Sequence, residues 1–409
     1  MSKGSCRFCG EELSTIFVDL GISPLANSYV ESVSQKEIMY PLRTYVCEHC
    51  FLVQVEDFET PEHIFSEYAY FSSYSDSWLN HCRNYVEHMI DKFQYSSDTN
   101  VVEIASNDGY LLQYFKEKGI SVLGIEPAAN VAKSAIEKGI DTVVDFFGTQ
   151  LANALKEKGK TADLLLGNNV LAHVPDLNDF VKGMKVLLNS HGTITMEFPH
   201  LLQLMEHNQF DTIYHEHFSY FSFTTVCNLF AQHKLSIYDV EKLETHGGSI
   251  RIYAKHSENR ELSISQAVQA LLEQEASLGM REIDTYKNFS DKIVEVKRRI
   301  MGLLIDLKNN GNTIVGYGAP AKGNTLINYC GIDRDYLDYT VDRSSYKQGT
   351  FLPGSRIPVY SPDVLKRTKP EYVLILPWNL KEEIMEQTTF IREWGGKWII
   401  PVPEMTVIS

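Results

Sequence analysis

The sequence predicts an α/β protein with a central doubly wound parallel sheet, a small cysteine-rich N-terminal domain and a second, smaller α/β domain at its C-terminus. Short apolar runs near residues 101, 122, 142, 163 and 193 alternate with helical segments, which is the pattern of a parallel sheet. A second strand, glycine turn and helix begins near residue 313, and four cysteines form two pairs before residue 51. A chain of 409 residues is also too long for one ordinary core.

Composition and charge narrow the class of protein. Apolar residues make up 44% of the chain and charged residues 22%, as in soluble globular proteins. We expect a cytoplasmic protein without a membrane partner, because no apolar run could span a bilayer and the N-terminus lacks a signal-peptide core. The net charge of −15 argues against nucleic-acid binding. An anionic small substrate is still compatible, since it needs only local basic groups or helix N-termini.

Four of the seven cysteines form a C-x2-C pair twice, at Cys6 and Cys9 and again at Cys47 and Cys50. Four thiolates at this spacing can close a tetrahedral zinc site with no open position for catalysis. The long gap between the pairs predicts that the metal joins two ends of a small domain. A disulfide or free thiols are the alternative, which a cytoplasmic setting disfavours.

The first strand of the central sheet is expected at 101–104, followed by a polar turn at 105–109 and a helix. Small turn residues and helical N–H groups let a nucleotide approach the backbone there. The next strand ends at Glu126, where a carboxylate suits two ribose hydroxyls. Asp145 and Phe146 follow a third strand and could bind and stack on an adenine. An ordinary βαβ unit without a ligand is the alternative.

Residues 214–220, with the sequence YHEHFSY, form the densest chemical cluster. His215 and His217 lack the i, i+4 spacing of a helical zinc pair. A proton-transfer site fits better, because the pKa of histidine lies near neutral and a neighbouring glutamate can fix its tautomer. A loop whose polar side chains satisfy one another is the alternative. His246, in a glycine turn at 245–251, either lines the same cleft or belongs to a plain hairpin.

Residues 262–309 are expected to be a helical spacer, and 313–324 then repeat the strand, glycine turn and helix. The glycines there and Asp342 could form a dinucleotide site, but their spacing is not G-x-G-x-x-G. Lys322 stands at the helix start, where a phosphate would sit. The loop 342–358 adds further basic residues. We therefore expect this domain to hold a diphosphate, with NAD as the alternative ligand.

Eight features occur in one order: the cysteine pairs, EIASNDGYLL, GIEPAANVA, NNVLAHVPDL, YHEHFSYFS, THGGSIRIYA, GYGAPAKGNTLINY and VDRSSYKQGTFLPGSRIPV. With this set the chain resembles the S-adenosylmethionine-dependent C-methyltransferases that act on nucleotide-linked keto-deoxysugars. The resemblance covers nearly the whole chain. It implies a zinc-binding domain at 1–70, a methyltransferase domain at 71–260, and a helical linker with a Rossmann-like domain at 261–409. The sugar nucleotide is expected between the last two domains.

The resemblance also implies roles for individual residues. His217 is expected to act as the general base, Glu216 to orient it or to carry a proton, and Tyr214 and His173 to donate hydrogen bonds to an oxyanion. Tyr68 matches a further active-site tyrosine of the family. The cofactor residues are expected to be Glu103, Ser106, Asn107, Asp108, Gly109, Glu126, Pro127, Asp145, Phe146, Asn168 and Asn169. The substrate residues are expected to be His246, Lys322, Asn324, Asp342 and Lys347.

The resulting hypothesis is an enzyme that uses S-adenosylmethionine and a structural zinc ion. It would add a methyl group next to the ketone of a 4-keto-deoxysugar carried by dTDP, GDP or CDP, at C-3, through an enolate. The alternatives are an NAD-dependent nucleotide-sugar oxidoreductase or epimerase on a similar frame, and a binding protein without catalysis. The sequence carries no clear oligomer signal and is compatible with a monomer.

Overall fold

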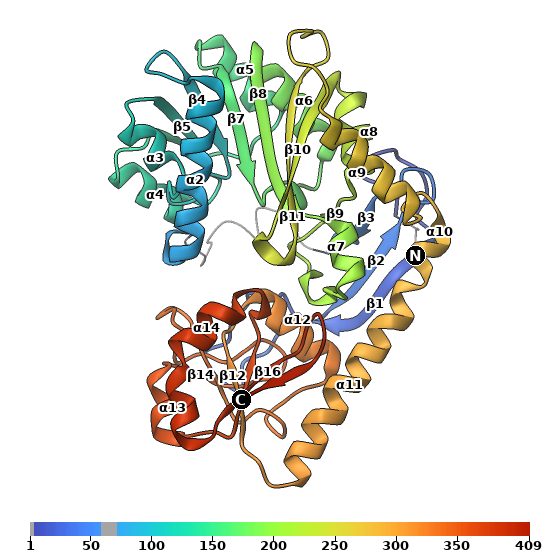
Figure 1. The fold of residues 1–409 in the computed structure, drawn as a ribbon, viewed down its shortest axis with the longest axis vertical. Coiled ribbons are helices and arrows are strands. Elements are labelled where there is room, and N and C mark those ends of the chain that lie inside the picture. Colours follow the sequence, from blue (N-terminus) through green and yellow to red (C-terminus); the bar gives the residue numbers. More distant parts are fainter. Residues whose placement is uncertain (1–3, 59–71) are drawn as a thin grey trace.

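The computed structural model describes residues 4–58 and 72–409, so Tyr68 lies outside the described residues. Within them the chain forms sheets of four, seven and six strands. Figure 1 shows the seven-stranded sheet in the upper part of the molecule and the six-stranded sheet in the lower part. The long helix α11 (Phe289–Asn309) runs along one side of the molecule and joins the two parts.

The seven-stranded sheet has the order β10-β11-β8-β7-β4-β5-β6. Its parallel strands are β4 (Asn100–Ile104), β5 (Ser121–Ile125), β6 (Thr142–Val143), β7 (Ala162–Asn168) and β8 (Leu188–Pro199). Strand β11 (Ser249–His256) runs antiparallel to β8, and β10 (Leu235–Leu243) runs antiparallel to β11. The predicted doubly wound sheet is therefore confirmed, and it carries a terminal hairpin that the sequence analysis did not place in it.

Helices cover both faces of this sheet, as the alternation of side chains along its strands requires. Val101 and Leu164 face one cluster of buried residues, whereas their neighbours Val102 and Leu165 face another. The first face packs against α2 (Asp76–Phe93), α3 (Leu112–Glu117) and α4 (Ala129–Glu137). The second face packs against α5 (Thr149–Glu157), α6 (Leu177–Leu187) and α8 (Phe223–Gln232).

One strand of the central sheet is shorter than the sequence indicates. An apolar strand is expected at 141–147, but among the described residues only Thr142–Val143 pair, with β5 as their partner. The strand is the edge of the sheet in the described part of the chain, and Val144 and Phe146 are exposed. Because no described strand pairs with its outer side, the apolar run has no second partner there to extend the ladder.

The helical spacer expected at 262–309 is confirmed as α9 (Gln266–Ser277), α10 (Ile283–Lys287) and α11. The sheet that follows has the order β14-β13-β12-β15-β16-β17. Its strands are β12 (Ile314–Tyr317), β13 (Thr340–Val341), β14 (Val359–Tyr360), β15 (Tyr372–Ile375), β16 (Lys397–Ile400) and β17 (Thr406–Ile408). Its helices are α12 (Ala321–Cys330), α13 (Asp363–Thr368) and α14 (Lys381–Gln387). The prediction that 398–400 end the strands is wrong, because β17 adds an antiparallel strand to β16.

The N-terminal sheet consists of β1 (Thr15–Ser23), β2 (Tyr40–Val46), β3 (Val53–Val55) and β9 (Ser219–Tyr220). Strand β9 comes from the middle of the chain, directly after the YHEH motif, and pairs antiparallel with β3. Short helical elements complete the described part of the chain: α7 (Leu201–Glu206), η1 (Ser72–Tyr74), η2 (Leu171–His173), η3 (Phe210–Thr212), η4 (Thr245–Gly247), η5 (Trp378–Leu380) and η6 (Thr389–Trp394).

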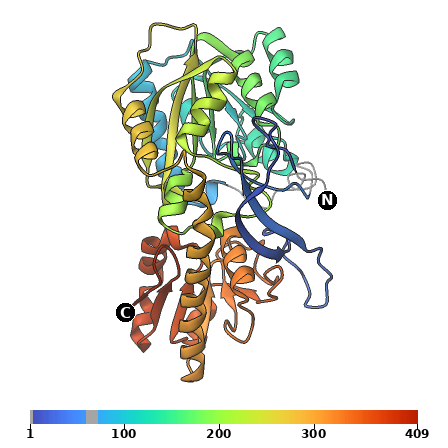
Figure 2. The same cartoon turned by 90° about the vertical axis from the view of Figure 1, so that its right-hand side faces the viewer.

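The N-terminal segment contributes to the cores of both larger parts of the molecule. Cys6, Phe8 and Leu52 are buried with the second face of the central sheet, whereas Phe17 and Val55 are buried with the C-terminal sheet and α11. Figure 2 shows this segment, in blue, beside the joint between the upper and lower parts. The N-terminal segment therefore links the two larger sheets. The domain boundaries at 70 and 260 stay predictions.

No helix in the described part of the chain has both the length and the apolar character needed to cross a membrane.

Candidate active site

The carboxyl ends of the two large sheets face one another (Figure 1). Contacts across the joint support this arrangement: Trp378 Nε1, after β15, donates a hydrogen bond of 2.6 Å to Asp211 Oδ2 in η3. Thr325 Oγ1 on α12 donates to the main-chain oxygen of Ile213 at 3.0 Å. Open α/β sheets bind ligands at the carboxyl ends of their strands, so this joint is where two ligands can meet.

The turn after β4 has the left-handed backbone that a close ligand approach requires. Its φ angles are +56° at Ala105, +47° at Asn107 and +76° at Gly109. A Cβ at Gly109 would lie 2.3 Å from Ile140 Cδ1, so a side chain there would strain the left-handed backbone and displace the end of Ile140. The predicted cofactor turn therefore forms a tight loop at the sheet edge.

Glu126, directly after β5, is hydrogen-bonded to this turn. Its carboxylate accepts hydrogen bonds of 2.9 Å from the N–H groups of Asn107 and Ala128. Burial raises the pKa of Glu126, while these two N–H donors lower it. The acid predicted to bind a ribose is thus buried beside the turn, with Pro127 following it.

Other predicted cofactor residues lie around the same turn. Asp108 accepts hydrogen bonds from Ser73 and Lys138, and the side chain of Asn107 accepts one from the N–H of Ser72 at 3.0 Å. Glu103 is fully buried under the turn, and burial raises its pKa well above the usual value.

Three buried atoms here, Ser106 Oγ, Asp108 Oδ1 and Asn169 Oδ1, have no hydrogen-bond partner among the described residues. Buried polar atoms normally have partners, so the set fits a polar ligand such as S-adenosylmethionine.

The structure does not bring all of the predicted cofactor residues together. Asn168 ends β7 and Asn169 follows it with a φ of +55°, close to the turn after β4 because β4 and β7 are neighbours in the sheet. Asp145 and Phe146 are instead exposed beyond the edge strand β6, where Asp145 Oδ1 accepts a hydrogen bond from the N–H of Phe146. Their contact with an adenine stays a prediction.

The four N-terminal cysteines form one cluster. Their Sγ atoms all lie within 4.8 Å of one another, and Cys6, Cys47 and Cys50 are buried. The N–H of Gly10 donates to the oxygen of Cys6 at 2.9 Å, which closes the first of two tight turns that aim the thiols inward. Four soft ligands at these distances suit a closed tetrahedral zinc site.

The YHEH motif forms a loop between η3 and β9. Nδ1 of His217 lies 2.8 Å from the main-chain oxygen of Thr212, and Nε2 lies 2.7 Å from the hydroxyl oxygen of Tyr214. A carbonyl oxygen can only accept, so Nδ1 carries the proton of the neutral ring. Nε2 is then the basic atom, and it accepts the hydrogen bond of Tyr214.

His173 lies against His217, with ring centroids 4.7 Å apart. Its Nδ1 donates to the main-chain oxygen of Glu216 at 2.8 Å. Burial lowers the pKa of His173 to about 4. Burial, and then the neighbouring His173, hold the pKa of His217 well below its usual value. Both rings are therefore neutral at pH 7, as a general base must be before it takes a proton.

The side chain of Glu216 points away from His217. Its two oxygens each lie 2.8 Å from Nδ2 of Asn27 in the N-terminal segment, and burial raises its pKa to about 7. The main-chain oxygen of Thr212 orients the ring of His217. No described contact joins the carboxylate of Glu216 to this ring, so the orienting role predicted for Glu216 lacks structural support. His215 also points elsewhere, because its Nε2 donates to the oxygen of Pro41 at 3.1 Å.

His246 and Lys322 lie close to this loop. The amide of Asn169 donates to His246 Nε2 at 3.0 Å, and burial with the nearby charge of Lys322 lowers the pKa of His246 to about 4. Lys322 on α12 donates to Asn379 at 2.8 Å, and its charge also lowers the pKa of His217. His246 from the side of the central sheet and Lys322 from the side of the C-terminal sheet therefore lie in one site at the joint of the two sheets.

The remaining predicted substrate residues surround the turn after β12. Asp342 accepts hydrogen bonds from the N–H groups of Ala319 at 2.7 Å and Ser344 at 2.8 Å. Lys347 donates to the oxygen of Ala319 at 2.8 Å. Asn324 is buried and donates to the oxygen of Ala26 at 2.6 Å. These contacts brace the turn and the N-terminal segment.

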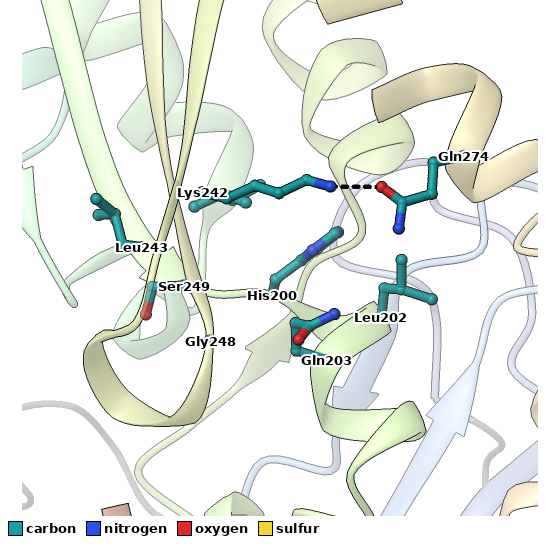
Figure 3. A pocket seen from close by; sticks show the side chains of 9 residues that line it. His200, Leu202, Gln203, Lys242, Leu243, Gly248, Ser249 and Gln274 are labelled. Atoms are coloured by element: carbon teal, nitrogen blue, oxygen red, sulfur yellow. Dashed lines mark hydrogen bonds between the residues drawn. The ribbon is translucent and has the colours of Figure 1, made fainter. Parts of the chain in front are cut away.

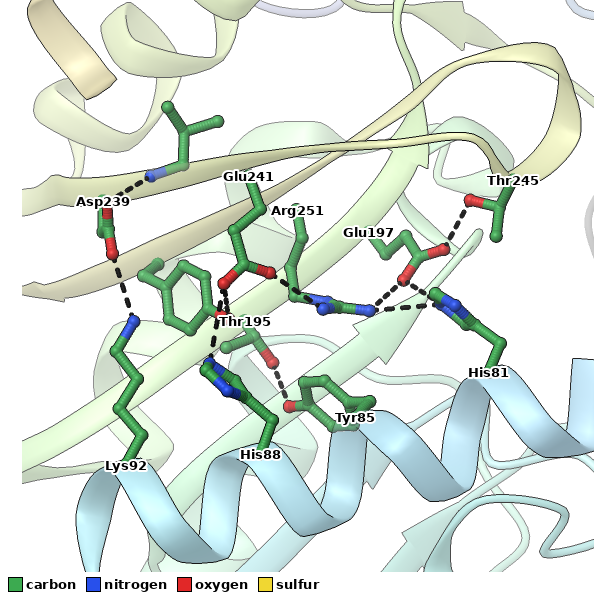
Figure 4. A network of polar contacts seen from close by, with 12 residues as sticks. His81, Tyr85, His88, Lys92, Thr195, Glu197, Asp239, Glu241, Thr245 and Arg251 are labelled. Carbon is green, nitrogen blue, oxygen red and sulfur yellow. Dashed lines mark hydrogen bonds and ion pairs between the residues drawn. The ribbon is translucent and has the colours of Figure 1, made fainter.

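A buried ion network that the sequence analysis missed supports the site from behind (Figure 4). Glu197, at the end of β8, lies 2.7 Å from Arg251 Nη2 and 2.9 Å from His81 Nε2 on α2. Thr245, next to His246, donates to its other oxygen at 2.9 Å. Burial alone would raise the pKa of Glu197, but His81 and Arg251 lower it to about 2. The sequence did contain a signal for this network, namely a glutamate and an arginine within otherwise apolar strands.

A cavity of about 250 Å³ lies beside the hairpin of β10 and β11 (Figure 3). Its lining includes His200, Gln203, Lys242, Gly248 and Gln274. None of the predicted site residues lines it, so it is separate from the site described above.

Comparisons with known proteins agree with this architecture. Family models match residues 6–65 (described as "Putative zinc binding domain"), 79–240 (methyltransferase domain) and 244–403 (C-methyltransferase C-terminal domain). The chain is 36% identical over 406 residues to the C-methyltransferase NovU of Streptomyces niveus, covering 99% of this chain and 96% of that protein. A ubiquinone biosynthesis O-methyltransferase of Bartonella quintana (strain Toulouse) is 26% identical over 95 residues, which are 23% of this chain and 38% of that protein.

Among solved structures, the PH0226 protein from Pyrococcus horikoshii OT3 is similar with a TM-score of 0.37 and 15% identity, over 49% of this chain and 99% of that chain. The full-length match and the three family models are far more informative. Fold and site together define a methyltransferase that depends on S-adenosylmethionine and has a zinc-binding domain. The chain belongs to the C-methyltransferase family.

Proposed function

We propose that this enzyme methylates the carbon next to the ketone of a nucleotide-linked 4-keto-deoxysugar, at C-3, through an enolate. The observation that carries the proposal is the neutral His217, whose basic Nε2 faces Tyr214 at the joint of the two sheets. A sugar carbon is not a nucleophile until its proton leaves, and a neighbouring ketone makes that loss possible. A histidine held neutral at pH 7 suits this task.

In the proposed reaction, Nε2 of His217 takes the proton from the carbon, and the electrons of the C–H bond move into the enolate. A hydrogen bond from Tyr214 stabilises the oxygen on which negative charge develops. The single N–H of the neutral His173 ring already donates to the main-chain oxygen of Glu216, so the donor role expected for His173 is not part of this proposal. S-adenosylmethionine supplies an electrophilic methyl group on a positively charged sulfur. The enolate carbon forms the new C–C bond as the S–CH3 bond breaks, and the proton leaves His217 to solvent after product release.

The cofactor is proposed to lie at the carboxyl ends of β4, β5 and β7, against the turn at 105–109 and Glu126. The sugar nucleotide is proposed to lie opposite, with Lys322 near its diphosphate. A half-buried lysine at the start of α12 can neutralise a phosphate where helical N–H groups also point. His246 completes the wall between the two ligands. Tyr68 stays a proposed active-site residue.

An NAD-dependent reaction at the turn after β12 is the alternative. The carboxylate of Asp342 accepts two main-chain N–H groups there, as the carboxylate of Glu126 does after β5, so these contacts do not separate the two reactions. Titration with each cofactor separates the two reactions. We expect S-adenosylmethionine to bind and NAD to leave the protein fluorescence unchanged.

The direct test is mass spectrometry of dTDP-, GDP- and CDP-linked keto-deoxysugars incubated with the enzyme and S-adenosylmethionine. We expect one of them to gain a single methylene unit, on carbon and next to the ketone by NMR. Methyl transfer to oxygen or nitrogen, or no transfer to any nucleotide-linked sugar, would contradict the proposal.

A further inference from the structure

The carbonyl oxygen of Phe218 is the anchor of the loop that carries His217. Phe218 directly follows His217 and is buried. Its oxygen accepts a hydrogen bond of 3.0 Å from the N–H of Val55 on β3 and a second one of 2.9 Å from Nη1 of Arg7. A carbonyl with two donors on its two lone pairs is held more firmly than one with a single donor.

Arg7 lies between the two cysteines of the first zinc pair and reaches the loop through Nη1 of its guanidinium. Nη2 donates to the oxygen of Val55 at 2.7 Å and pairs with Asp57, while the guanidinium carbon lies 5.4 Å from the centre of the Phe218 ring. The planar fork therefore joins β3 to the residue after His217. Arginine suits such a two-point contact because its donors have a fixed geometry.

The backbone of Arg7 is fixed from the other side by the zinc site. Its N–H donates to Oε1 of Gln54 at 2.9 Å, and Nε2 of the same glutamine lies 3.2 Å from Sγ of Cys6. Asn178 on α6 donates to the oxygen of Arg7 at 3.1 Å. A closed metal site with these contacts holds the base of the Arg7 side chain rigidly.

We propose that Arg7 is a positioning residue, which transmits the rigidity of the zinc site to the loop of Tyr214 and His217. This inference rests on the proposed function, because it takes His217 as the base. The zinc-binding domain then serves the reaction directly: it fixes the carbonyl of Phe218, and through it the distance of His217 from the substrate carbon. A displacement of about 1 Å in such a group costs about a hundredfold in rate.

The test compares Arg7→Met and Arg7→Lys with the unchanged enzyme, each with its zinc content measured first. We expect both variants to keep one zinc per chain and the affinity for S-adenosylmethionine, because the cofactor turn makes no contact with Arg7. We expect kcat to fall at least about tenfold, with a much smaller change in KM. Lysine keeps the charge but, as a single ammonium group, cannot reproduce the two-point contact.

A second readout separates positioning from general damage. A loosened loop admits water to His217, so its pKa rises toward the usual value and the acid limb of the kcat profile moves to higher pH. The charged and titratable groups around His217 (Tyr214, Tyr220, His173, His246 and Lys322) are unchanged in the variants. Asp57→Asn is the matched control: it removes only the exposed partner of Arg7, and we expect kcat within about twofold, as for exposed ion pairs.

A zinc-loaded Arg7→Lys variant with unchanged kcat, or with a lower kcat and an unmoved acid limb, would overturn the inference. The same outcomes in zinc-loaded Arg7→Met would also overturn it. If Arg7→Met loses zinc, the result for Arg7→Lys alone is used. His217→Asn, assayed alongside, distinguishes the two levels of the account. Unchanged turnover in His217→Asn contradicts the proposed base, whereas unchanged turnover in the Arg7 variants alone contradicts only the positioning role.

Discussion

The hydroxyl oxygen of Tyr214 lies 2.7 Å from Nε2 of His217, and the Nδ1 of the same ring donates to the oxygen of Thr212. The tautomer of His217 is therefore set by the main chain, and its basic atom is turned toward a hydrogen-bond donor. When a substrate proton is taken by Nε2, Tyr214 is free to donate to an oxygen of the substrate instead. This pair makes proton removal and oxyanion stabilisation possible at one place.

Replacing the base tests this pair. We expect His217→Asn to lower kcat by about 10²- to 10⁴-fold, the usual contribution of a general base. The affinity for S-adenosylmethionine, measured by isothermal titration calorimetry, should stay within about twofold, because the cofactor turn makes no contact with His217. His215→Asn is the matched control, since the His215 ring donates to the main-chain oxygen of Pro41 and lies against Tyr40 and Phe58. A loss in that variant as large as in His217→Asn would contradict the assignment.

The pH dependence of kcat follows from the lowered pKa of His217. The base works only when neutral, so activity is retained above its pKa and is lost as the pH falls through it. Burial and His173 hold that pKa well below the usual value, so we expect the acid limb to lie below pH 6.5. NMR titration of labelled histidines checks the assignment. An acid limb above pH 6.5 that belongs to His217 would show that the ring is not buried as described.

The cofactor turn gives a prediction about binding. Glu126 accepts hydrogen bonds from Asn107 and Ala128, and a ribose would add to these. We expect Glu126→Gln to raise the dissociation constant of S-adenosylmethionine about 10- to 100-fold, which corresponds to the loss of hydrogen bonds to a charged group. The value of kcat at saturating cofactor should change little. An unchanged dissociation constant would place the ribose elsewhere.

Metal analysis tests the cysteine cluster. We expect about one zinc per chain in the purified enzyme. Cys47→Ser should lose this zinc and lower the melting temperature, because a structural zinc site contributes folding energy. Cys227→Ser is the control, since Cys227 lies outside the cluster and should leave the zinc content unchanged. Full zinc content in Cys47→Ser would exclude this residue as a ligand.

The sequence predicted the elements that depend on local patterns. The strands near residues 101 and 163, the turn at 105–109 and the cysteine cluster all follow from short-range spacing and apolar periodicity. The strand expected at 141–147 was overextended, because an apolar run does not show whether a second strand will pair with it. The helical spacer was predicted correctly from its composition.

Contacts between distant segments could not be predicted in this way. The pairing of β3 with β9, the hydrogen bond of Asn27 to Glu216 and the reach of Arg7 to Phe218 join residues far apart in the sequence. The motif placed Glu216 beside His217, but the backbone of the loop turns the two side chains in different directions. The charged residues Glu197 and Arg251 inside apolar strands were visible, and their mutual burial is the signal that was overlooked.

The most direct test of the central claim is the exchange of hydrogen at the carbon next to the ketone. The enzyme is incubated in D2O with a nucleotide-linked 4-keto-deoxysugar and S-adenosylhomocysteine, the demethylated form of the cofactor. Deuterium in the sugar is then followed by NMR and mass spectrometry. The account predicts that the unchanged enzyme places deuterium at that single carbon and that His217→Asn does not. Exchange at the same rate with His217→Asn would contradict it.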